Sequence, residues 1–364
     1  MAEKKKHHFV PRMLLKNFSD SRKKLFMYER EKNKFQKDIP YLSQCQKDNF
    51  YGKTHEIEDF LSKIEHITET IIRNVIIAKD SESILDINEY RILSIFVISQ
   101  YLRTRGHLER TVDSLEDFKH RSKDIISQFY QAYESNETVD EALERLLPSI
   151  DFSDIAGSNV SIAFGNYSSY SDLAVLLVNN KTNINFIISN DPVIAKNYYY
   201  PKNGYGLNSV GVFYFLPIDT KTAVLLIDEV AYFKPGTISP YINLIDESDI
   251  IKLNTWQFSK SNLLYSFDET SLRNTINRNL EYIKNNAQYV RRRLRLDLSR
   301  EKPYLSIEEI NKLVEVKMQD TNLFNETILD VVEEDNIPSF LHIYEEIRKK
   351  GRNLYFGIPL RKDI

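Results

Sequence analysis

Apolar residues recur three and four positions apart along much of the chain, which is the spacing of one face of a helix. The stretch from Ile57 to Val75 follows this spacing throughout. Residues 92–98 are apolar nearly all round, so the helix that contains them should be buried, and Asp86 or Asn88 can cap its start. Helices are therefore predicted over residues 55–79, 90–105, 108–147, 245–264, 270–296, 307–318 and 338–350.

Short apolar runs separated by polar residues predict β-hairpins in two parts of the chain. One hairpin lies near the N-terminus, over residues 25–35. Two more follow in the middle, where residues 173–178 precede 183–188 and residues 212–216 precede 223–227. Helices, then a sheet, then helices indicate an α+β fold. We expect a largely helical domain with antiparallel β-hairpins in its middle, residues 1–267, and a helical C-terminal extension, residues 268–364.

The composition is that of a globular protein, with 42% hydrophobic and 28% charged residues. The one cysteine, Cys45, excludes an intramolecular disulfide and a zinc site built from several cysteines. No apolar stretch approaches the roughly 20 residues of a membrane-spanning helix. The N-terminal lysines are followed by histidines and not by the apolar run of a signal peptide. The sequence therefore predicts a cytoplasmic protein without a membrane partner.

The net charge of −3 conceals two basic clusters. Residues 1–36 hold eleven Lys and Arg against four Asp and Glu, and residues 291–295 hold four arginines. A polyanion-binding face requires such clusters, although solvated helix faces carry them as well. The residues that we select as candidate substrate contacts are Lys5, Lys6, Arg12, Arg291 and Arg292.

Two adjacent histidines, His7 and His8, stand directly before Phe9, Val10 and Pro11. Imidazoles serve as general bases or acids, as metal ligands and as phosphate binders. Pro11 restricts Val10 to an extended conformation, so the histidine pair should lead into a turn or a short strand. The pair is equally consistent with a chemical site and with an N-terminal structural clamp.

A polar stripe runs along the helix that should be buried, because Gln100 and Arg103 lie about one turn apart. A buried guanidinium needs a carboxylate, and the candidate partners are Glu58, Glu65 and Asp191. Arg103 could present its charge to an anionic substrate, with Gln100 orienting it. It could equally tie two helices together as a structural ion pair.

Carboxylates supply the remaining candidate site residues. Asp191 follows a predicted strand and precedes a proline that holds it extended, a position that suits either a site or a chain reversal. Glu58 and Glu65 lie two turns apart on one helix and, with the histidine pair, could bind a divalent metal such as Mn, Fe or Zn. No particular metal or other cofactor can be identified from the sequence alone. The catalytic candidates are His7, His8, Gln100, Arg103, Glu58, Glu65 and Asp191.

Taken together, these segments resemble a bacterial family known as domain of unknown function 4238. The resemblance covers about residues 5–267, and its most specific part is the opening His7-His8-Phe9-Val10-Pro11 with residues 14–18 after it. The other segments that are similar to this family are residues 57–65, 100–103, 189–193, 215–218, 223–227 and 253–266.

Members of this family resemble components of bacterial anti-phage defence loci, which implies an effector that is toxic or acts on nucleic acid. We expect a nuclease that cleaves RNA or DNA through a site of histidine, arginine and carboxylate. The alternatives are a non-catalytic sensor, a module that binds nucleic acid or protein and holds a structural polar network, and a nucleotide hydrolase or transferase. The C-terminal helices are expected to mediate homo-oligomerisation or contact with a defence-system partner.

Overall fold

The computed structural model describes residues 6–52, 56–77, 85–112, 152–199, 206–234, 239–319 and 337–344, with single residues between 115 and 141. The helices are α1 (Arg12–Asn17), α2 (Glu56–Ile77), α3 (Ile87–Arg103), α6 (Phe152–Gly165), α7 (Glu229–Tyr232), α8 (Glu247–Lys260), α9 (Glu269–Glu301) and α10 (Ile307–Gln319), with short 3-10 turns η1 (Tyr41–Ser43) and η2 (Tyr167–Ser169). The strands are β1 (Lys6–His8), β2 (Lys24–Glu29), β3 (Lys34–Pro40), β4 (Gln46–Asp48), β5 (Ala174–Asn180), β6 (Ile188–Ser189), β7 (Ile194–Asn197), β8 (Val212–Pro217), β9 (Thr222–Ile227), β10 (Tyr241–Leu244) and β11 (Leu263–Ser266).

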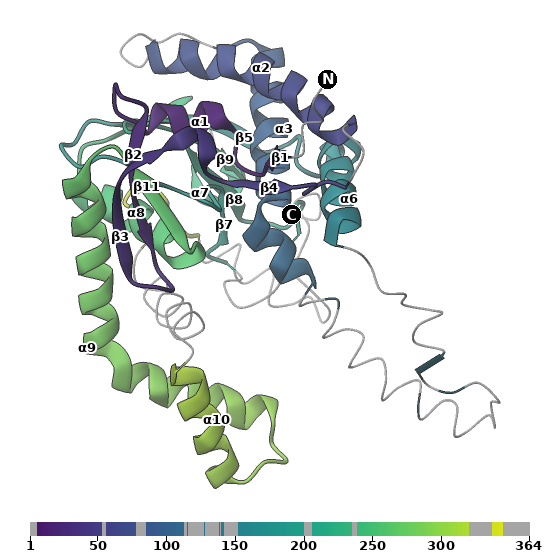
Figure 1. Cartoon of the computed structure of the whole chain (residues 1–364), viewed down its shortest axis with the longest axis vertical. Coiled ribbons are helices and arrows are strands. Elements are labelled where there is room, and N and C mark those ends of the chain that lie inside the picture. Colours follow the sequence, from purple (N-terminus) through teal and green to yellow (C-terminus); the bar gives the residue numbers. More distant parts are fainter. Residues whose placement is uncertain are drawn as a thin grey trace.

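Two sheets form the centre of this α+β molecule (Figure 1). The larger sheet, of strand order β10-β5-β9-β8-β7, is antiparallel except for the parallel pair β10 and β5. Every residue of β8 and β9 is buried, and both strands are rich in the branched and aromatic residues that suit a covered sheet. The smaller sheet is antiparallel, with the order β3-β2-β11-β6. Strands β1 and β4 form a separate antiparallel pair.

Helix α3 is the buried helix that the sequence predicts, and it packs against β5 and β8 of the larger sheet. Asp86 caps its N-terminus, because the Asp86 carboxylate accepts hydrogen bonds from the backbone N–H groups of Asn88 and Glu89. The Glu89 carboxylate in turn accepts from the Asp86 N–H, which completes a capping box. Helices α2 and α6 lie on α3 (Figure 1). Helix α3 ends at Arg103, since Thr104 is extended, and helical turns resume over residues 105–112.

The local predictions are confirmed for α2, α8, α9 and α10 and for the hairpins β2–β3 and β8–β9. The hairpin predicted over residues 173–188 is wrong, because β5 pairs with β9 and β10 while β6 belongs to the smaller sheet. Residues 263 and 264, predicted as the end of a helix, begin strand β11. Residues 338–344 are not helical, and most of the helix predicted over residues 108–147 lies outside the described residues.

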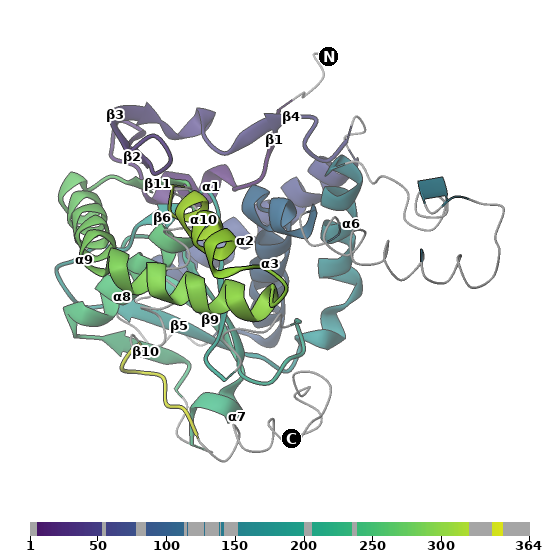
Figure 2. The same cartoon turned by 90° about the horizontal axis from the view of Figure 1, so that it is seen from below.

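The C-terminal helices build an arm that projects from the body (Figure 1). Helix α9 begins on the body, where Leu272 and Ile276 join an apolar cluster that also contains residues of β2, β11 and α8. Along its distal half, Leu294 and Leu298 are buried in the same cluster as Val314 of α10, and α10 crosses α9 there (Figures 1 and 2). None of the helices that the structure describes has both the length and the apolar character that crossing a membrane requires.

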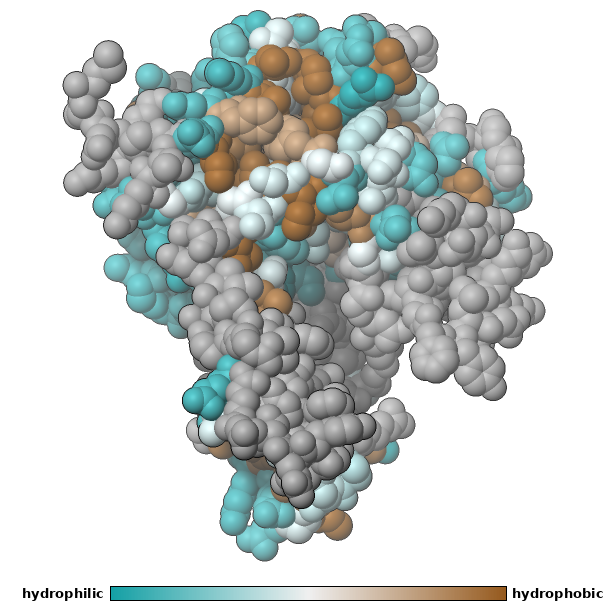
Figure 3. Space-filling model, turned by 90° about the vertical axis from the view of Figure 1, so that its right-hand side faces the viewer, coloured by the Kyte–Doolittle hydropathy of each residue, from teal (hydrophilic) through white to brown (hydrophobic). Residues whose placement is uncertain are grey.

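An apolar patch lies on the surface over α2 and α6 (Figure 3). Phe60 of α2 is 42% exposed, and its ring meets the ring of Phe164 of α6 edge-on, with the centroids 4.7 Å apart. Ile67 and Ile162 are also exposed. Helix α2 therefore carries exposed apolar side chains among mostly polar ones, and the same helix carries the candidate residue Glu65.

Candidate functional site

Arg103, the last residue of α3, is the charged centre of the site and is only 1% exposed. Its Nη2 donates a hydrogen bond to Glu65 Oε1 of α2 at 2.8 Å. Its Nε and Nη2 both donate to Gln100 Oε1, at 3.0 and 2.8 Å. Gln100 Nε2 donates to the Phe9 carbonyl at 2.8 Å. Glu65, one of the three carboxylates that the sequence offers as partners for Arg103, therefore pairs with it, and Gln100 links Arg103 to the N-terminal segment.

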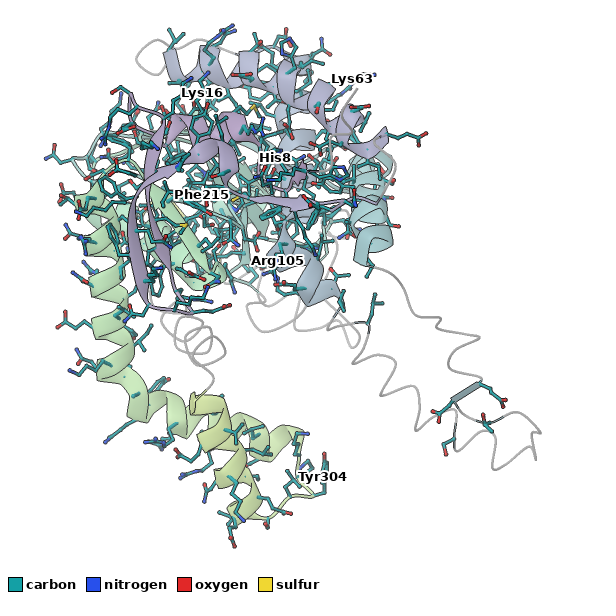
Figure 4. The ribbon with its side chains drawn as sticks, viewed as in Figure 1. His8, Lys16, Lys63, Arg105, Phe215 and Tyr304 are labelled. Carbon is teal, nitrogen blue, oxygen red and sulfur yellow. The ribbon has the colours of Figure 1, made fainter. Side chains whose placement is uncertain are left out.

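The histidine pair lies on the short strand β1, and the two side chains differ in exposure. His7 is fully buried, and its Nδ1 accepts a hydrogen bond from the Tyr51 backbone N–H at 3.2 Å. The rings of His7 and Tyr51 are stacked, with centroids 5.7 Å apart. The Tyr51 hydroxyl donates to the His8 carbonyl at 3.2 Å. His7 therefore holds the N-terminal strand in place, whereas His8 is only half-buried. Figure 4 labels His8 below α2, with Lys16 of α1 to its upper left.

His8 is held neutral by its surroundings. Burial, together with the charges of Arg12 and Arg103, lowers its pKa to about 4, and hydrogen bonds to Leu42 and Gln46 oppose this shift. The exposed Arg12 of α1 donates from Nε to His8 Nε2 at 3.0 Å. Nε2 therefore carries the lone pair, and a bound anion that engages Arg12 would expose it as a proton acceptor.

In the interior of the site, Tyr51 and Arg103 each change the pKa of the other. Burial raises the pKa of the Tyr51 hydroxyl, although the Arg103 charge opposes the shift. Burial by itself would lower the pKa of Arg103, but Tyr51, Glu65 and Glu58 outweigh it, so the pKa is raised and the guanidinium stays charged. The buried Nη1 of Arg103 has no hydrogen-bond partner among the described residues. An anion or a water molecule could satisfy this donor.

We call the residues that meet here the His–Arg cluster. It consists of His7, His8, Arg12, Tyr51, Glu65, Gln100 and Arg103. The cluster brings together five of the seven catalytic candidates, and Glu58 lies close enough to affect the pKa of Arg103. Tyr51 was not among the sequence candidates, because it follows a polar loop and no spacing rule links it to His7.

Asp191 belongs to a neighbouring arrangement, which includes Thr104 and Arg110 and lies near His107. It is 1% exposed, and its Oδ1 accepts from Thr104 Oγ1 at 2.6 Å while Oδ2 accepts from Arg110 Nη2 at 3.0 Å. A Cβ added to Gly106 would lie 2.6 Å from Asp191 Oδ2, so this close approach requires a glycine. Asp191 therefore holds the helix break that directly follows Arg103. The sequence analysis did not predict that Asp191 bonds to Thr104 and Arg110, because these contacts join segments more than eighty residues apart.

The remaining residues that the sequence suggests either lie away from the His–Arg cluster or do not come together as metal ligands. Lys5 lies outside the described residues, and Lys6 is exposed on β1. Arg291 and Arg292 are on the arm, away from the His–Arg cluster (Figure 1). Within the described part of the chain, no three His, Cys, Asp or Glu side chains come together as a group able to hold a metal ion. Glu58, Glu65 and the histidine pair therefore do not assemble the metal site that their sequence positions allow.

Comparison with known proteins gives a family assignment. A family model described as "Protein of unknown function (DUF4238)" matches residues 6–267. No curated protein and no solved structure matches the chain significantly. The matched range contains the whole His–Arg cluster and both sheets, while α9 and α10 follow it.

Proposed function

This chain belongs to the DUF4238 family of proteins of unknown function, and from the geometry of its His–Arg cluster we propose that it is a nuclease that cleaves RNA or DNA. The observation that carries the proposal is the pair of Arg12 and His8 at the surface, next to the buried charge of Arg103. In the setting that the family resemblance implies, the nuclease acts as an effector of anti-phage defence in the cytoplasm.

The phosphodiester binds first at Arg12. This guanidinium is exposed, and only its Nε is committed to His8, so its remaining N–H groups can take a phosphate oxygen. Arg103 lies close enough to lower the pKa of His8, so it adds positive potential at the same place. Two guanidinium groups therefore favour an anion beside the imidazole.

Binding of the phosphate converts His8 into a better base. The Arg12 charge is one cause of the low pKa of about 4, and a phosphate that neutralises Arg12 removes this contribution. The negative charge of the phosphate raises the pKa further, toward the range in which a general base is effective. His8 is therefore a weak base in the free protein and a stronger one in the complex.

The chemical step uses the lone pair on His8 Nε2. This nitrogen accepts the proton of the attacking group, which is a ribose 2′-hydroxyl in RNA or a water molecule in either nucleic acid. The new oxygen–phosphorus bond forms as the bond to the leaving oxygen breaks, and the leaving oxygen takes a proton from solvent. Arg12 balances the charge that develops on the phosphorus oxygens. Gln100 and Glu65 hold Arg103 in its orientation.

Cleavage of total RNA and of plasmid DNA by the purified protein tests the proposal, with and without Mg²⁺ or Mn²⁺. We expect His8→Ala and Arg12→Ala each to lose at least about 100-fold in rate, the lower bound for removal of a general base and for removal of a donor that stabilises transition-state charge. Lys16→Ala is the matched control, because Lys16 lies one turn from Arg12 on α1 and pairs with Glu69 at 3.6 Å. Circular dichroism and the melting temperature verify that the variants are folded. Undiminished cleavage by folded His8→Ala would refute the role of His8.

A second function is favoured by the burial of the cluster. His7 is fully buried and Arg103 nearly so, and both make hydrogen bonds that tie β1, α2 and α3 together. Such a network suits a non-catalytic module that binds nucleic acid or protein. In that case no condition yields cleavage, and Arg103→Met lowers the melting temperature without any activity to lose. A nuclease instead loses activity in His8→Ala while its melting temperature changes little.

A further inference from the structure

The arm presents one continuous face to solvent along α9. Tyr282, Asn285, Tyr289, Arg292 and Leu296 are three and four residues apart, so they lie on one side of the helix. All of them are exposed, with Tyr289 at 52% and Leu296 at 49%. Beside this line lie three more exposed side chains, Lys284, Gln288 and Arg295. We call these eight residues the α9 face.

The structure separates the arginines that are adjacent in the sequence. Arg291 is turned toward α10, where its Nε lies 3.0 Å from Glu315 Oε1 and its Nη2 donates to Oε2 at 3.2 Å. Arg292, the next residue, is exposed on the α9 face. Arg291 therefore closes the helical hairpin of the arm, while Arg292 is available to a ligand.

The α9 face is cationic, and one exposed acid, Glu281, borders it at its N-terminal end. Helix α9 holds eight Lys and Arg against four Asp and Glu. Among the exposed side chains that the structure describes between residues 282 and 299, the charged ones are Lys284, Arg292 and Arg295. The others are tyrosines, amides, a leucine and a serine. Cations for phosphates, with amides and aromatic rings for sugars and bases, are the side chains that bind nucleic acid.

We propose that the α9 face binds the sugar–phosphate backbone of a nucleic acid. From Tyr282 to Leu296 the face is about 21 Å long at 1.5 Å per residue, which spans about six nucleotides at 3.4 Å each. Lys284, Arg292 and Arg295 contact phosphates, and Tyr289 stacks on a base. This deepens the proposed nuclease function, because the arm gives the enzyme a second contact with its substrate away from the His–Arg cluster.

Charge decides against a second copy of the chain as the occupant of this face. Two α9 faces brought together would oppose Lys284, Arg292 and Arg295 of one copy to the same cations of the other. Like charges facing one another across an interface disfavour association. A phosphate backbone offers the opposite charge along the whole face.

Fluorescence anisotropy of labelled 20-nucleotide single-stranded RNA, single-stranded DNA and duplex DNA tests the proposal on the full chain, in EDTA and with His8→Ala to prevent cleavage. We expect Lys284→Glu/Arg292→Glu/Arg295→Glu to weaken binding more than tenfold and to lower the slope of log affinity against log salt by about 2 to 3. Tyr289→Ala should weaken single-strand binding about fivefold or more. The single reversal Arg292→Glu should weaken binding to a smaller extent, and its matched control is Lys312→Glu, an equal charge change at an exposed site on α10 that should leave binding unchanged.

The outcomes distinguish this inference from the nuclease proposal. Binding that depends on the α9 face, in a protein that cleaves nothing, supports the arm and refutes the nuclease. If the protein cleaves nucleic acid and the triple reversal leaves its nucleic-acid affinity unchanged, the nuclease proposal is supported and the proposal for the α9 face is overturned. Light scattering of wild type and triple variant covers the remaining case. A change of oligomeric state without any change in nucleic-acid affinity would make the α9 face a contact between copies and overturn the proposal.

Discussion

Removal of the Glu65 carboxylate tests whether Arg103 depends on its ion pair. Arg103 is 1% exposed and Glu65 is 24% exposed, with Nη2 and Oε1 2.8 Å apart. Two unit charges about 4 Å apart at an effective dielectric constant of about 20 interact by about 4 kcal/mol. Loss of one partner of a buried pair costs about 3–5 kcal/mol. Because Glu65 is partly exposed and Gln100 remains bonded to Arg103, we expect Glu65→Ala to lower the free energy of unfolding by about 2–4 kcal/mol.

Urea unfolding of wild type and variants measures this loss. Glu69→Ala is the matched control, because Glu69 lies one turn further along α2 and pairs with Lys16 at 3.6 Å while both side chains are largely exposed. That substitution should cost less than about 0.5 kcal/mol. Arg103→Met/Glu65→Leu removes both charges and should recover most of the stability. A Glu65→Ala loss no larger than the Glu69→Ala loss would refute the reasoning, because Arg103 would then not need its carboxylate.

Three further predictions follow from the structure. Gly106→Ala should destabilise the protein by about 1–3 kcal/mol in thermal or urea unfolding, because its Cβ would lie 2.6 Å from Asp191 Oδ2. The folded-state pKa of His8 is depressed to about 4 from 6.5, so only the unfolded chain gains a proton at this histidine between these values. Stability should therefore fall as pH drops from 6.5 to 4, and less so in His8→Gln. Ser339→Ala should cost about 1–2 kcal/mol, because the Ser339 hydroxyl donates to the buried carboxylate of Asp249.

Each of these predictions has a control. Gly165→Ala places its Cβ where nothing lies within 4 Å, so it should be neutral or slightly stabilising, and Gly106→Ala behaving in the same way would contradict the close approach. An NMR titration of His8 with a midpoint near 6.5 would contradict the pH prediction. The control for Ser339→Ala is Ser306→Ala. Ser306 is exposed and caps α10 in the arm, so this control removes a serine hydroxyl that forms no bond to a buried carboxylate.

Part of the site could be predicted because its elements are local. The apolar spacing marks α2 and α3, and Asp86 marks the start of α3 through its capping box. A buried arginine must be paired, so the position of Arg103 in an apolar helix predicts a carboxylate partner. The choice of Glu65 among three carboxylates depends on how α2 lies on α3, which no local spacing contains.

By itself, the sequence determined where most of the described long helices and two of the three predicted hairpins form, and that the protein is α+β, although it missed α1 and α6 and placed a helix at residues 338–344, which are not helical. It also singled out Arg103 and the histidine pair as candidate site residues. Only the tertiary structure decided that β5 pairs with β9 and β10, that Arg12 engages His8, and that Arg291 closes the arm while Arg292 faces solvent. The physical reason is the range of the interactions. Helical and strand periodicity reflects neighbours a few residues apart, so it identifies the buried face of an element. The partner of that face lies tens or hundreds of residues away, and it is selected by the packing of the whole chain.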